Sequence, residues 1–445
     1  MAPAPDSPRA TGGRRRTGRR GALLPALTVP LSALLLLGLG AGGVAGDPRH
    51  HRAGDWVTGW AASPVEGGDI PGSDCPAGDG LRNRTVRNVV FLSAGGDRVR
   101  VRLTNAFGER PVRVGGASVA VHDDGAAAVP GSVRPLTFDG GAGVKIPAGA
   151  EVFSDPVRLE VEALSTLLVS VYAPEATGPV TNHPFTAQGN FLAEGDATAE
   201  ASGEGFSSTP CWMLTSGVDV EPSGDVVGTV VALGDSITDT AATTGNANRR
   251  WPDHLARRLN AVEGPTLSVA NAGLGGNLLL GAREGEPYYG VGALDRLDRD
   301  VLGQSGVRTV VLLEGINDIG HGTGAEDIIA GYREVVERVH ARGLRIAGGT
   351  LLPFKGSAIW TRQRQATWNE VNAWIRTSGE FDAVVDFAAA TASAGDPQRL
   401  APAYDSGDGL HPGDAGTRAM AAAVDLDRLI PASPGADDRP SRHRR

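Results

Sequence analysis

The segment Val226-Val-Gly-Thr-Val-Val-Ala-Leu-Gly-Asp-Ser-Ile-Thr238 joins a run of apolar residues to a short polar turn. A continuous apolar run of this length is typical of a strand that is buried on both faces of a parallel sheet. A serine directly after such a strand lies on the strand-to-helix turn, with an exposed hydroxyl and a backbone N–H near the positive helix end. Ser236 is therefore a candidate nucleophile, although Gly-Asp-Ser alone more often forms a turn or a helix cap.

The same alternation of apolar runs and amphipathic stretches continues through the C-terminal half of the chain. Buried strands are predicted over residues 226–233, 267–270, 307–313, 345–352 and 383–387. Helices are predicted over residues 251–259, 325–342, 361–377 and 412–429. This alternation predicts an α/β domain over residues 226–430, in which helices cover both faces of a parallel sheet. An active site in such a sheet lies beyond the carboxyl ends of the strands.

The region before this domain has a different pattern, with short alternating segments that are rich in β-branched residues. The clearest of them are residues 87–93, 97–103, 112–114, 117–121 and 166–172. Glycine- and aspartate-containing turns such as Ala94-Gly-Gly-Asp97 separate them. We therefore expect a β-sandwich or jelly-roll-like domain over residues 55–205.

Both ends of the chain differ from these two domains. Clustered arginines precede an apolar run over residues 23–39 and small residues up to Gly46, the pattern of a signal peptide. Residues 1–46 are therefore predicted to be a signal peptide of the twin-arginine or general secretory type, with an uncleaved anchor as the alternative. After cleavage we expect a secreted, extracellular protein without a stable membrane anchor. The polar, proline-containing residues 434–445 are predicted to be a disordered tail.

Charge and cysteine usage narrow the possible partners. The chain of 445 residues has a formal net charge of −9, and its basic cluster lies in the predicted signal peptide. The remaining acidic chain is not expected to bind nucleic acid or an anionic membrane electrostatically. The two cysteines, Cys75 and Cys211, fall in the exported part, where a pair most often forms a structural disulfide. No closely spaced metal-ligand motif is visible, so we expect neither a metal nor a cofactor.

Three further polar motifs follow predicted strands or precede the last helix. Asn271-Ala-Gly-Leu-Gly-Gly-Asn277 contains glycines that would let backbone N–H groups approach a ligand oxygen, or would only form a turn. Asn317, in Gly315-Ile-Asn-Asp318, could offer its side-chain amide to an oxyanion. In Asp408-Gly-Leu-His411, the carboxylate could accept from Nδ1–H of the imidazole and leave Nε2 to take a proton from a serine.

Taken together, these motifs resemble the four blocks of the SGNH, or GDSL, hydrolase (lipase/acylhydrolase) family, over residues 226–430. The resemblance implies a flavodoxin-like doubly wound sheet, with Ser236 as the nucleophile and His411 as the base. The family's Asp-x-x-His pattern makes Asp408 the acid that orients the base. The resemblance also implies an oxyanion hole formed by Ser236, Gly276 and Asn317. The β domain is similar only in its fold to the accessory domain of some secreted members.

The expected function is hydrolysis of carboxylic esters through an acyl-enzyme, with a small-molecule or polymeric ester as substrate. A polysaccharide acetyl or feruloyl esterase and a lipase or phospholipase remain alternatives for the specific activity. The non-enzymatic alternative is a ligand- or carbohydrate-binding protein. Nucleotide binding is not supported, because the glycine loops have neither a Gly-x-Gly-x-x-Gly nor a P-loop motif. His183, His321 and Trp251 could approach the site, but sequence spacing does not place them.

Overall fold

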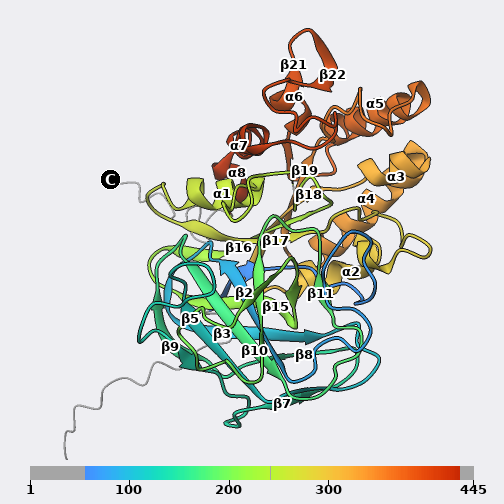
Figure 1. Cartoon of the computed structure of the whole chain (residues 1–445). Helices are drawn as coiled ribbons and strands as arrows, with labels where there is room; N and C mark the ends of the chain where they lie inside the picture. The colour runs from blue at the N-terminus through green and yellow to red at the C-terminus, as the bar shows by residue number, and fades with distance from the viewer. Residues whose placement is uncertain (1–55, 241, 431–445) are drawn as a thin grey trace, which may run out of the picture. The chain divides into compact units, whose positions relative to one another are not determined.

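The computed structural model describes residues 56–240 and 242–430 (Figure 1). The predicted signal peptide, residues 1–46, and the predicted tail, residues 434–445, lie outside the described residues. Within the described part of the chain, no helix combines the length and hydrophobicity needed to cross a membrane. All described residues belong to one compact unit.

The C-terminal region contains a parallel sheet of five strands. In chain order they are β16 (Val226–Gly234), β17 (Thr266–Gly273), β18 (Val307–Leu313), β19 (Arg345–Gly349) and β20 (Ala383–Val385). Their order across the sheet is β17-β16-β18-β19-β20, and all neighbours are parallel. This 2-1-3-4-5 order is that of flavodoxin-like doubly wound folds. The parallel sheet expected from the continuous apolar runs is thus confirmed, and β16 is its first strand.

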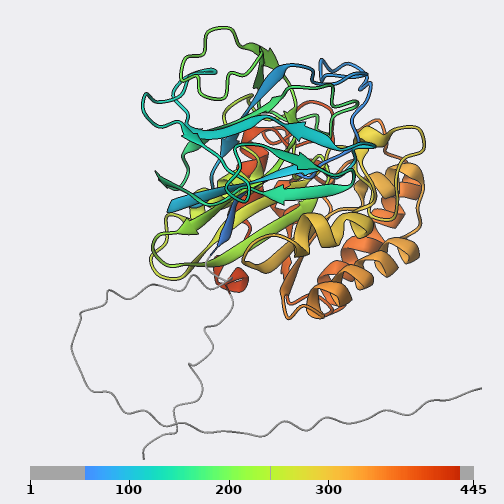
Figure 2. The same cartoon turned by 90° about the horizontal axis from the view of Figure 1, so that it is seen from below.

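Helices cover this sheet on both sides (Figure 1). On one side α1 (Trp251–Leu259) contacts α7 (Asp414–Ala422), and on the other α4 (Ala325–His340) contacts α5 (Arg362–Thr377). The helices α4 and α5 lie side by side in both views (Figures 1 and 2). The shorter helical segments are α2 (Ala293–Leu297), η2 (Asp298–Leu302), α3 (Ile316–His321), α6 (Phe387–Thr391), α8 (Leu426–Leu429) and the 3₁₀ turn η1 (Pro287–Tyr289).

The predicted helix over residues 412–429 is wrong as a single element. The structure has α7 and then α8, because Asp425 leaves the helical conformation and caps α8 by accepting a hydrogen bond from the backbone N–H of Asp427. By contrast, α1 has the predicted bounds. Its buried Trp251, Leu255 and Leu259 recur every four residues and so form one apolar face.

The N-terminal region consists of antiparallel strands in two main sheets. One sheet has the order β1 (Val57–Ala61), β15 (Thr215–Pro222), β3 (Gly96–Asn105) and β8 (Ala150–Phe153), and β9 (Val157–Val161) also pairs with β3. The other has the order β13 (Ser207–Thr209), β12 (Asn190–Glu194), β2 (Arg84–Phe91), β10 (Thr166–Ala173), β5 (Gly116–Val121) and β6 (Arg134–Pro135). Two small pairs, β11 (Asn182–His183) with β14 (Trp212–Met213) and β4 (Val112–Val114) with β7 (Val144–Ile146), complete the region.

The two main sheets share one hydrophobic core. Val86 and Val169 from one sheet and Val101 and Val218 from the other are fully buried in the same cluster. Such face-to-face packing is consistent with the expected sandwich, while a jelly-roll topology stays a prediction. β13 and β15 belong to these sheets although they lie beyond the predicted end of the β domain at residue 205, and β15 is an interior strand between β1 and β3. A disulfide joins Cys75 to Cys211.

The two regions meet through buried polar contacts near β1. The backbone N–H of Thr58 donates to the carbonyl oxygen of Ser305 and to the hydroxyl of Thr229 on β16, both over 3.1 Å. The Ser305 hydroxyl in turn donates to Asp219 on β15 over 2.6 Å. Because buried polar groups are costly unless they are paired, these bonds hold β1 against the parallel sheet in a defined register.

Candidate active site

Ser236 lies on a tight turn at the carboxyl end of β16. The Asp235 carboxylate accepts from the backbone N–H of Ile237 over 2.8 Å, and the Asp235 carbonyl accepts from Thr238 and Asp239 over 3.0 Å each. The expectation of a helix immediately after Ser236 is wrong, because the described residues up to Arg250 form turns and α1 begins only at Trp251. The position of the Ser236 N–H is therefore set by the turn and not by a helix dipole.

The turn presents Ser236 to the histidine predicted to be its base. Ser236 Oγ lies 2.8 Å from Nε2 of His411. On the other side of the ring, Nδ1 of His411 lies 2.5 Å from an oxygen of Asp408. The second Asp408 oxygen accepts from the backbone N–H groups of Leu410 and His411 over 2.9 and 2.8 Å. The segment thus turns back on itself so that carboxylate, imidazole and hydroxyl form one hydrogen-bonded row.

The electrostatics of Asp408 suit an acceptor. Burial alone would raise the pKa of this carboxyl, but the hydrogen bonds from the His411 ring and from the backbone lower the pKa below its ordinary value. An ionised Asp408 can only accept, so Nδ1 of His411 carries the hydrogen. Nε2 is then the acceptor nitrogen, which is the state that a base needs to remove the Ser236 proton.

Gly276 occupies a backbone conformation that requires glycine. Its φ is +73°, and a Cβ at this position would lie 2.3 Å from the Tyr289 ring. Two hydrogen bonds fix the loop around it: Leu274 N–H donates to the Gly234 carbonyl over 3.0 Å, and Asp318 accepts from Leu279 N–H over 2.9 Å. The glycine loop is therefore attached both to the end of β16 and to the segment after β18.

Asn317 lies in the first turn of α3, directly after β18. Its side-chain Nδ2 donates to the Asn277 carbonyl over 2.9 Å, while its Oδ1 accepts from Arg283 over 3.2 Å. The two contacts fix which end of the amide is the donor. Because Nδ2 carries two hydrogens, one remains for a ligand oxygen.

A fully buried arginine connects the ends of β16 and β17. Arg296, on α2, donates to the Gly234 carbonyl over 3.1 Å, to the Ala272 carbonyl over 2.8 Å and to Oδ1 of Asn277 over 2.8 Å. It also pairs with Asp300 over 3.4 Å. One rigid guanidinium thus holds the strand end before Ser236 and both sides of the glycine loop.

Several acidic groups are buried around Arg296. Burial, with a smaller contribution from neighbouring Asp318, raises the pKa of Asp235 to about 6. Burial and the nearby Asp235 raise the pKa of Glu314 well above its ordinary range, and neither carboxyl oxygen of Glu314 has a hydrogen-bond partner among the described residues. The Arg296 guanidinium lies 3.9 Å from an oxygen of Glu314 and lowers its pKa in part, but burial has the larger effect.

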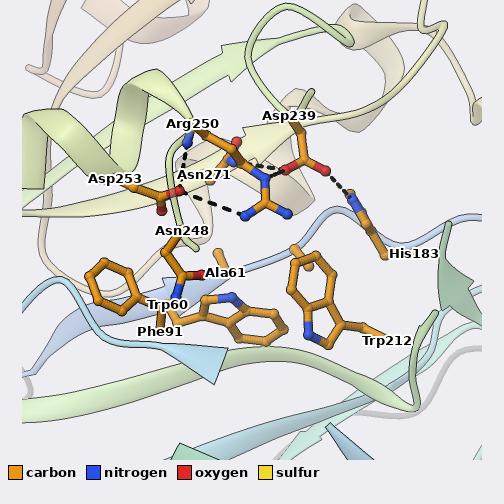
Figure 3. Close-up of a pocket in the computed structure, with 11 residues that line it drawn as sticks. Trp60, Ala61, Phe91, His183, Trp212, Asp239, Asn248, Arg250, Asp253 and Asn271 are labelled. Carbon is orange, nitrogen blue, oxygen red and sulfur yellow. Dashed lines mark hydrogen bonds and ion pairs between the residues drawn. The ribbon is translucent and has the colours of Figure 1, made fainter. Parts of the chain in front are cut away.

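Sequence spacing missed a second polar cluster beside Ser236, which lines a small pocket (Figure 3). His183, from β11, pairs with Asp239 over 2.6 Å, and Arg250 forms an ion pair with the same carboxylate. Asn271, in β17, donates to Asp239 over 3.1 Å. His183 lies 56 positions before Asp239 in another part of the fold, so no local pattern could have joined them.

The other two unassigned residues have different surroundings. Trp251 is buried and its indole N–H donates to the Thr238 hydroxyl over 3.2 Å. It therefore stabilises the turn that carries Ser236. His321 lies exposed at the end of α3. Over residues 56–240 and 242–430, no group of three or more His, Cys, Asp or Glu side chains is arranged to hold a metal ion.

The C-terminal region thus combines a flavodoxin-like parallel sheet with a hydrogen-bonded row of serine, histidine and aspartate. Residues 232–419 match the model of the GDSL-like lipase/acylhydrolase family. Members of the family act on esters, so the family indicates a hydrolase. No curated protein matches the chain.

Solved structures of GDSL proteins are similar to the same part of the chain. A putative lipolytic protein of the G-D-S-L family from Desulfitobacterium hafniense is 22% identical, with a TM-score of 0.36, over 46% of this chain and 99% of that one. A putative acylhydrolase from Bacteroides fragilis is 23% identical, with a TM-score of 0.34, over 44% and 84%. The native M. smegmatis aryl esterase is 15% identical, with a TM-score of 0.35, over 44% and 95%.

Proposed function

We propose that the protein is a serine esterase with Ser236 as nucleophile, His411 as base and Asp408 as the acid that orients His411. The observation that carries the proposal is the hydrogen-bonded row from Ser236 Oγ through both nitrogens of His411 to Asp408. A hydroxyl is a weak nucleophile on its own, and an adjacent base in the correct tautomer activates it. The match of residues 232–419 to an acylhydrolase family model supports the same reaction.

The reaction proceeds in two halves. In the first, Ser236 Oγ attacks the ester carbonyl while Nε2 of His411 takes the proton, and a tetrahedral oxyanion forms. His411 then gives the proton to the leaving alkoxide, and the acyl group stays on Ser236. In the second half, His411 removes a proton from water, which attacks the acyl-enzyme and releases the acid. Asp408 stabilises the imidazolium in both halves and keeps its proton on Nδ1.

The oxyanion is stabilised by three donors in this proposal. They are the backbone N–H groups of Ser236 and Gly276 and the free hydrogen on Nδ2 of Asn317. Support comes from the contacts that fix these donors: the Asp235 turn for Ser236, the required glycine conformation at residue 276, and the paired amide of Asn317. Donors that are already oriented need no reorganisation when charge develops.

We also propose that the enzyme is secreted. The disulfide between Cys75 and Cys211 supports an oxidising compartment, in line with the signal peptide predicted from residues 1–46. The substrate in this proposal is a small-molecule or polymeric carboxylic ester, and the reaction needs no cofactor. Because the net charge of the sequence is negative, a neutral ester is favoured as substrate over a nucleic acid or an anionic surface.

One observation favours a polysaccharide ester as the specific substrate over a lipid. A cleft of about 320 Å³ lies between the β region and the loop that follows the serine turn. Its lining includes the amides of Gln188, Asn246 and Asn248 and the ring of Phe191, together with His122 and Asp124. Amide groups offer both donors and acceptors to hydroxyls, and an aromatic ring offers an apolar surface to the C–H face of a sugar.

Two sets of hydrogen bonds hold the loop that borders this cleft. The Asn246 side chain accepts from Gly189 N–H over 2.7 Å in the β region. Thr244 donates its N–H and hydroxyl to Asp414 over 2.8 and 2.7 Å, three residues after His411. The loop that lines the cleft is therefore hydrogen-bonded to the first residue of α7, which follows the segment that carries His411.

The test of the esterase proposal is hydrolysis of p-nitrophenyl esters of increasing chain length by the full chain, its Ser236→Ala variant and a matched Ser207→Ala control on β13. We expect Ser207→Ala to match the wild type and Ser236→Ala to lose turnover by about 10⁴-fold or more. An organophosphorus ester should label the wild type and not Ser236→Ala. Wild-type turnover in Ser236→Ala would refute the proposal.

The polysaccharide alternative is tested with the same preparations. On an acetylated polysaccharide, Asn248→Ala and Phe191→Ala should raise KM, while their turnover of p-nitrophenyl acetate stays at the wild-type level. Preference for long-chain acyl esters, with polymer hydrolysis unaffected by either substitution, would favour the lipase alternative instead.

A further inference from the structure

A buried histidine of the β region, His183, contacts Asp239 in the segment that follows Ser236 (Figure 3). Nε2 of His183 lies 2.6 Å from a carboxylate oxygen of Asp239, three residues after the nucleophile. Both side chains are 3% exposed. A charge pair shielded from water to this degree is geometrically well defined, because breaking it would leave an unpaired buried charge.

The contacts of His183 determine its orientation. Nδ1 lies 2.7 Å from the carbonyl oxygen of Ser63, which can only accept a hydrogen bond. Burial alone would raise the pKa of Asp239, but Arg250 and His183 together lower the pKa below its ordinary value, so Asp239 also accepts. Each ring nitrogen therefore faces an acceptor oxygen, so the orientation of the imidazole is fixed on two sides.

The other groups around this ion pair complete the charge balance. Arg250 forms an ion pair with Asp239 and lies 3.7 Å from Asp253, whose pKa is raised by burial despite the nearby Arg250. Trp212 is the strand partner of His183 in the β11–β14 pair. The centroids of its ring and of the imidazole lie 5.4 Å apart. The cluster thus holds the Arg250 guanidinium and the His183 imidazole against two carboxyls, beside the Trp212 ring.

Asp239 contacts both segments that carry predicted backbone oxyanion donors, the turn around Ser236 and the glycine loop around Gly276. Its backbone N–H donates to the Asp235 carbonyl over 3.0 Å and so closes the turn around Ser236. Its side chain accepts from Asn271, whose own Oδ1 accepts from Gly273 N–H over 2.8 Å. A Cβ on Gly273 would lie 2.7 Å from Asp239 N, so the serine turn and the start of the glycine loop touch backbone to backbone.

A second contact from the β region reaches the same place. Ser63, which follows β1, accepts from His183 through its carbonyl and from Arg296 through its hydroxyl over 3.0 Å. Arg296 holds the Gly234 carbonyl and Asn277 Oδ1, on either side of the two donor segments. Two separate contacts, one through His183 and one through Arg296, thus connect the β region to the segments that carry the Ser236 and Gly276 N–H groups.

We propose that His183 is a positioning residue of the esterase reaction: by holding Asp239, it fixes the distance between the Ser236 and Gly276 N–H groups. The N-terminal β region is then part of the active centre and not a separable accessory domain. This inference rests on the proposed esterase function of Ser236. Because the contact acts on the oxyanion donors and not on the substrate, its loss affects turnover more than binding.

The variants that test the inference are His183→Ala and the less disruptive His183→Gln and Asp239→Asn, all in the full chain. His183→Gln retains a donor toward Asp239 without the charge, and Asp239→Asn retains the side-chain shape. The matched control is His340→Gln, since His340 forms a comparable pair with Asp382 over 3.0 Å, but at a half-exposed position on α4. Thermal unfolding identifies the variants that fold.

The readout is kcat per active serine, obtained by titrating the preparations with an organophosphorus ester and measuring p-nitrophenyl acetate hydrolysis. We expect His183→Ala and Asp239→Asn to lower kcat per titrated site about 10- to 100-fold with KM within about threefold, and His183→Gln to recover part of the loss. His340→Gln should match the wild type. A merely structural role would reduce the titrated fraction and leave kcat per site unchanged.

The two proposals fail in different ways. Unchanged kcat per titrated site in the folded His183→Gln and Asp239→Asn variants would overturn the positioning role, even when Ser236→Ala is inactive. Activity in Ser236→Ala would overturn the esterase proposal itself.

Discussion

The side-chain amide of Asn317 donates to the backbone oxygen of Asn277 over 2.9 Å, so the first turn after β18 holds the end of the glycine loop. Arg283 occupies the opposite end of the same amide over 3.2 Å. The amide cannot flip without losing both contacts, because the arginine can only donate and the carbonyl can only accept. Asn317 is therefore oriented before any substrate arrives, as an oxyanion donor needs to be.

Replacement of Asn317 by alanine should lower kcat about 100- to 1,000-fold, the usual effect of removing one oxyanion donor. KM should change much less, because the bond strengthens only as charge develops on the substrate oxygen. Steady-state hydrolysis of p-nitrophenyl acetate measures both constants. Asn317→Asp, which has the same shape but no donor, should be at least as inactive; a kcat near the wild type in either variant excludes Asn317 from the oxyanion hole.

Gly276→Ala should abolish most activity, for two separable reasons. Alanine at φ +73° is strained by about 1 kcal/mol, and its Cβ would displace the Tyr289 ring. Gly285 is the matched control, since its φ is also +73° but a Cβ there meets nothing within 4 Å. We expect Gly285→Ala to lose only stability, measured by chemical denaturation. Equal kcat in the two variants would argue against a donor at residue 276.

Asp408→Asn should lower kcat about 10²- to 10⁴-fold while Ser236 and His411 stay in place. The asparagine amide can donate toward Nδ1, which favours the tautomer with the hydrogen on Nε2, and this tautomer cannot accept the serine proton. The loss should appear in kcat and kcat/KM alike across pH 6 to 9. Asp405→Asn, in the same loop, is the comparison, because its carboxylate accepts only from the backbone N–H groups of Gly407 and Gly409.

The sequence predicted the parts of the site that depend on local pattern. The apolar run before Gly234 identified β16, and Asp408 and His411 are three positions apart on one turn. Their pairing with Ser236 followed from the resemblance to the GDSL hydrolase family, because Asp408 and His411 lie in the loop before α7 and not at a strand end of the sheet. These inferences needed no knowledge of packing.

The remaining contacts depend on chain segments that no local pattern connects. Arg296 lies 233 positions from Ser63, and His183 belongs to a two-residue strand that carries no alternation. The turn after Ser236 replaced the expected helix because Asp235 accepts from Ile237 and closes a tighter structure. Similarly, β15 joins the interior of a sheet through pairing with β1, which the sequence does not encode as a motif.

Removal of the disulfide by Cys75→Ser and Cys211→Ser should lower the free energy of unfolding by about 2 to 5 kcal/mol. The bond closes a loop of 136 positions, and an open loop of that length gains much conformational freedom on unfolding. Urea denaturation of the double variant beside the wild type measures the loss. Wild type treated with a reductant should give the same midpoint as the double variant, and a midpoint unchanged by either treatment would contradict the prediction.

Asp235→Asn should change how stability depends on pH. Burial raises the pKa of Asp235 to about 6 in the folded protein, above the ordinary value of about 3.9 in an unfolded chain. Between these values the folded state binds this proton and the unfolded state does not, so the contribution is fully present below about pH 4 and is lost as pH rises through about 6. Asparagine does not titrate, yet its Oδ1 can still accept from Ile237 N–H.

The wild type minus variant difference in the free energy of unfolding should therefore fall by about 1 to 3 kcal/mol from pH 4 to pH 7.5. Denaturant unfolding at half-unit pH intervals measures this difference, and it removes the contributions of acids that do not interact with Asp235. Asp97→Asn, at an exposed position on β3, is the control and should give a flat difference. A flat difference for Asp235→Asn as well would mean that Asp235 is ionised throughout. The charge beside Ser236 would then be permanent, and His411 would face a second carboxylate at every pH at which the enzyme acts.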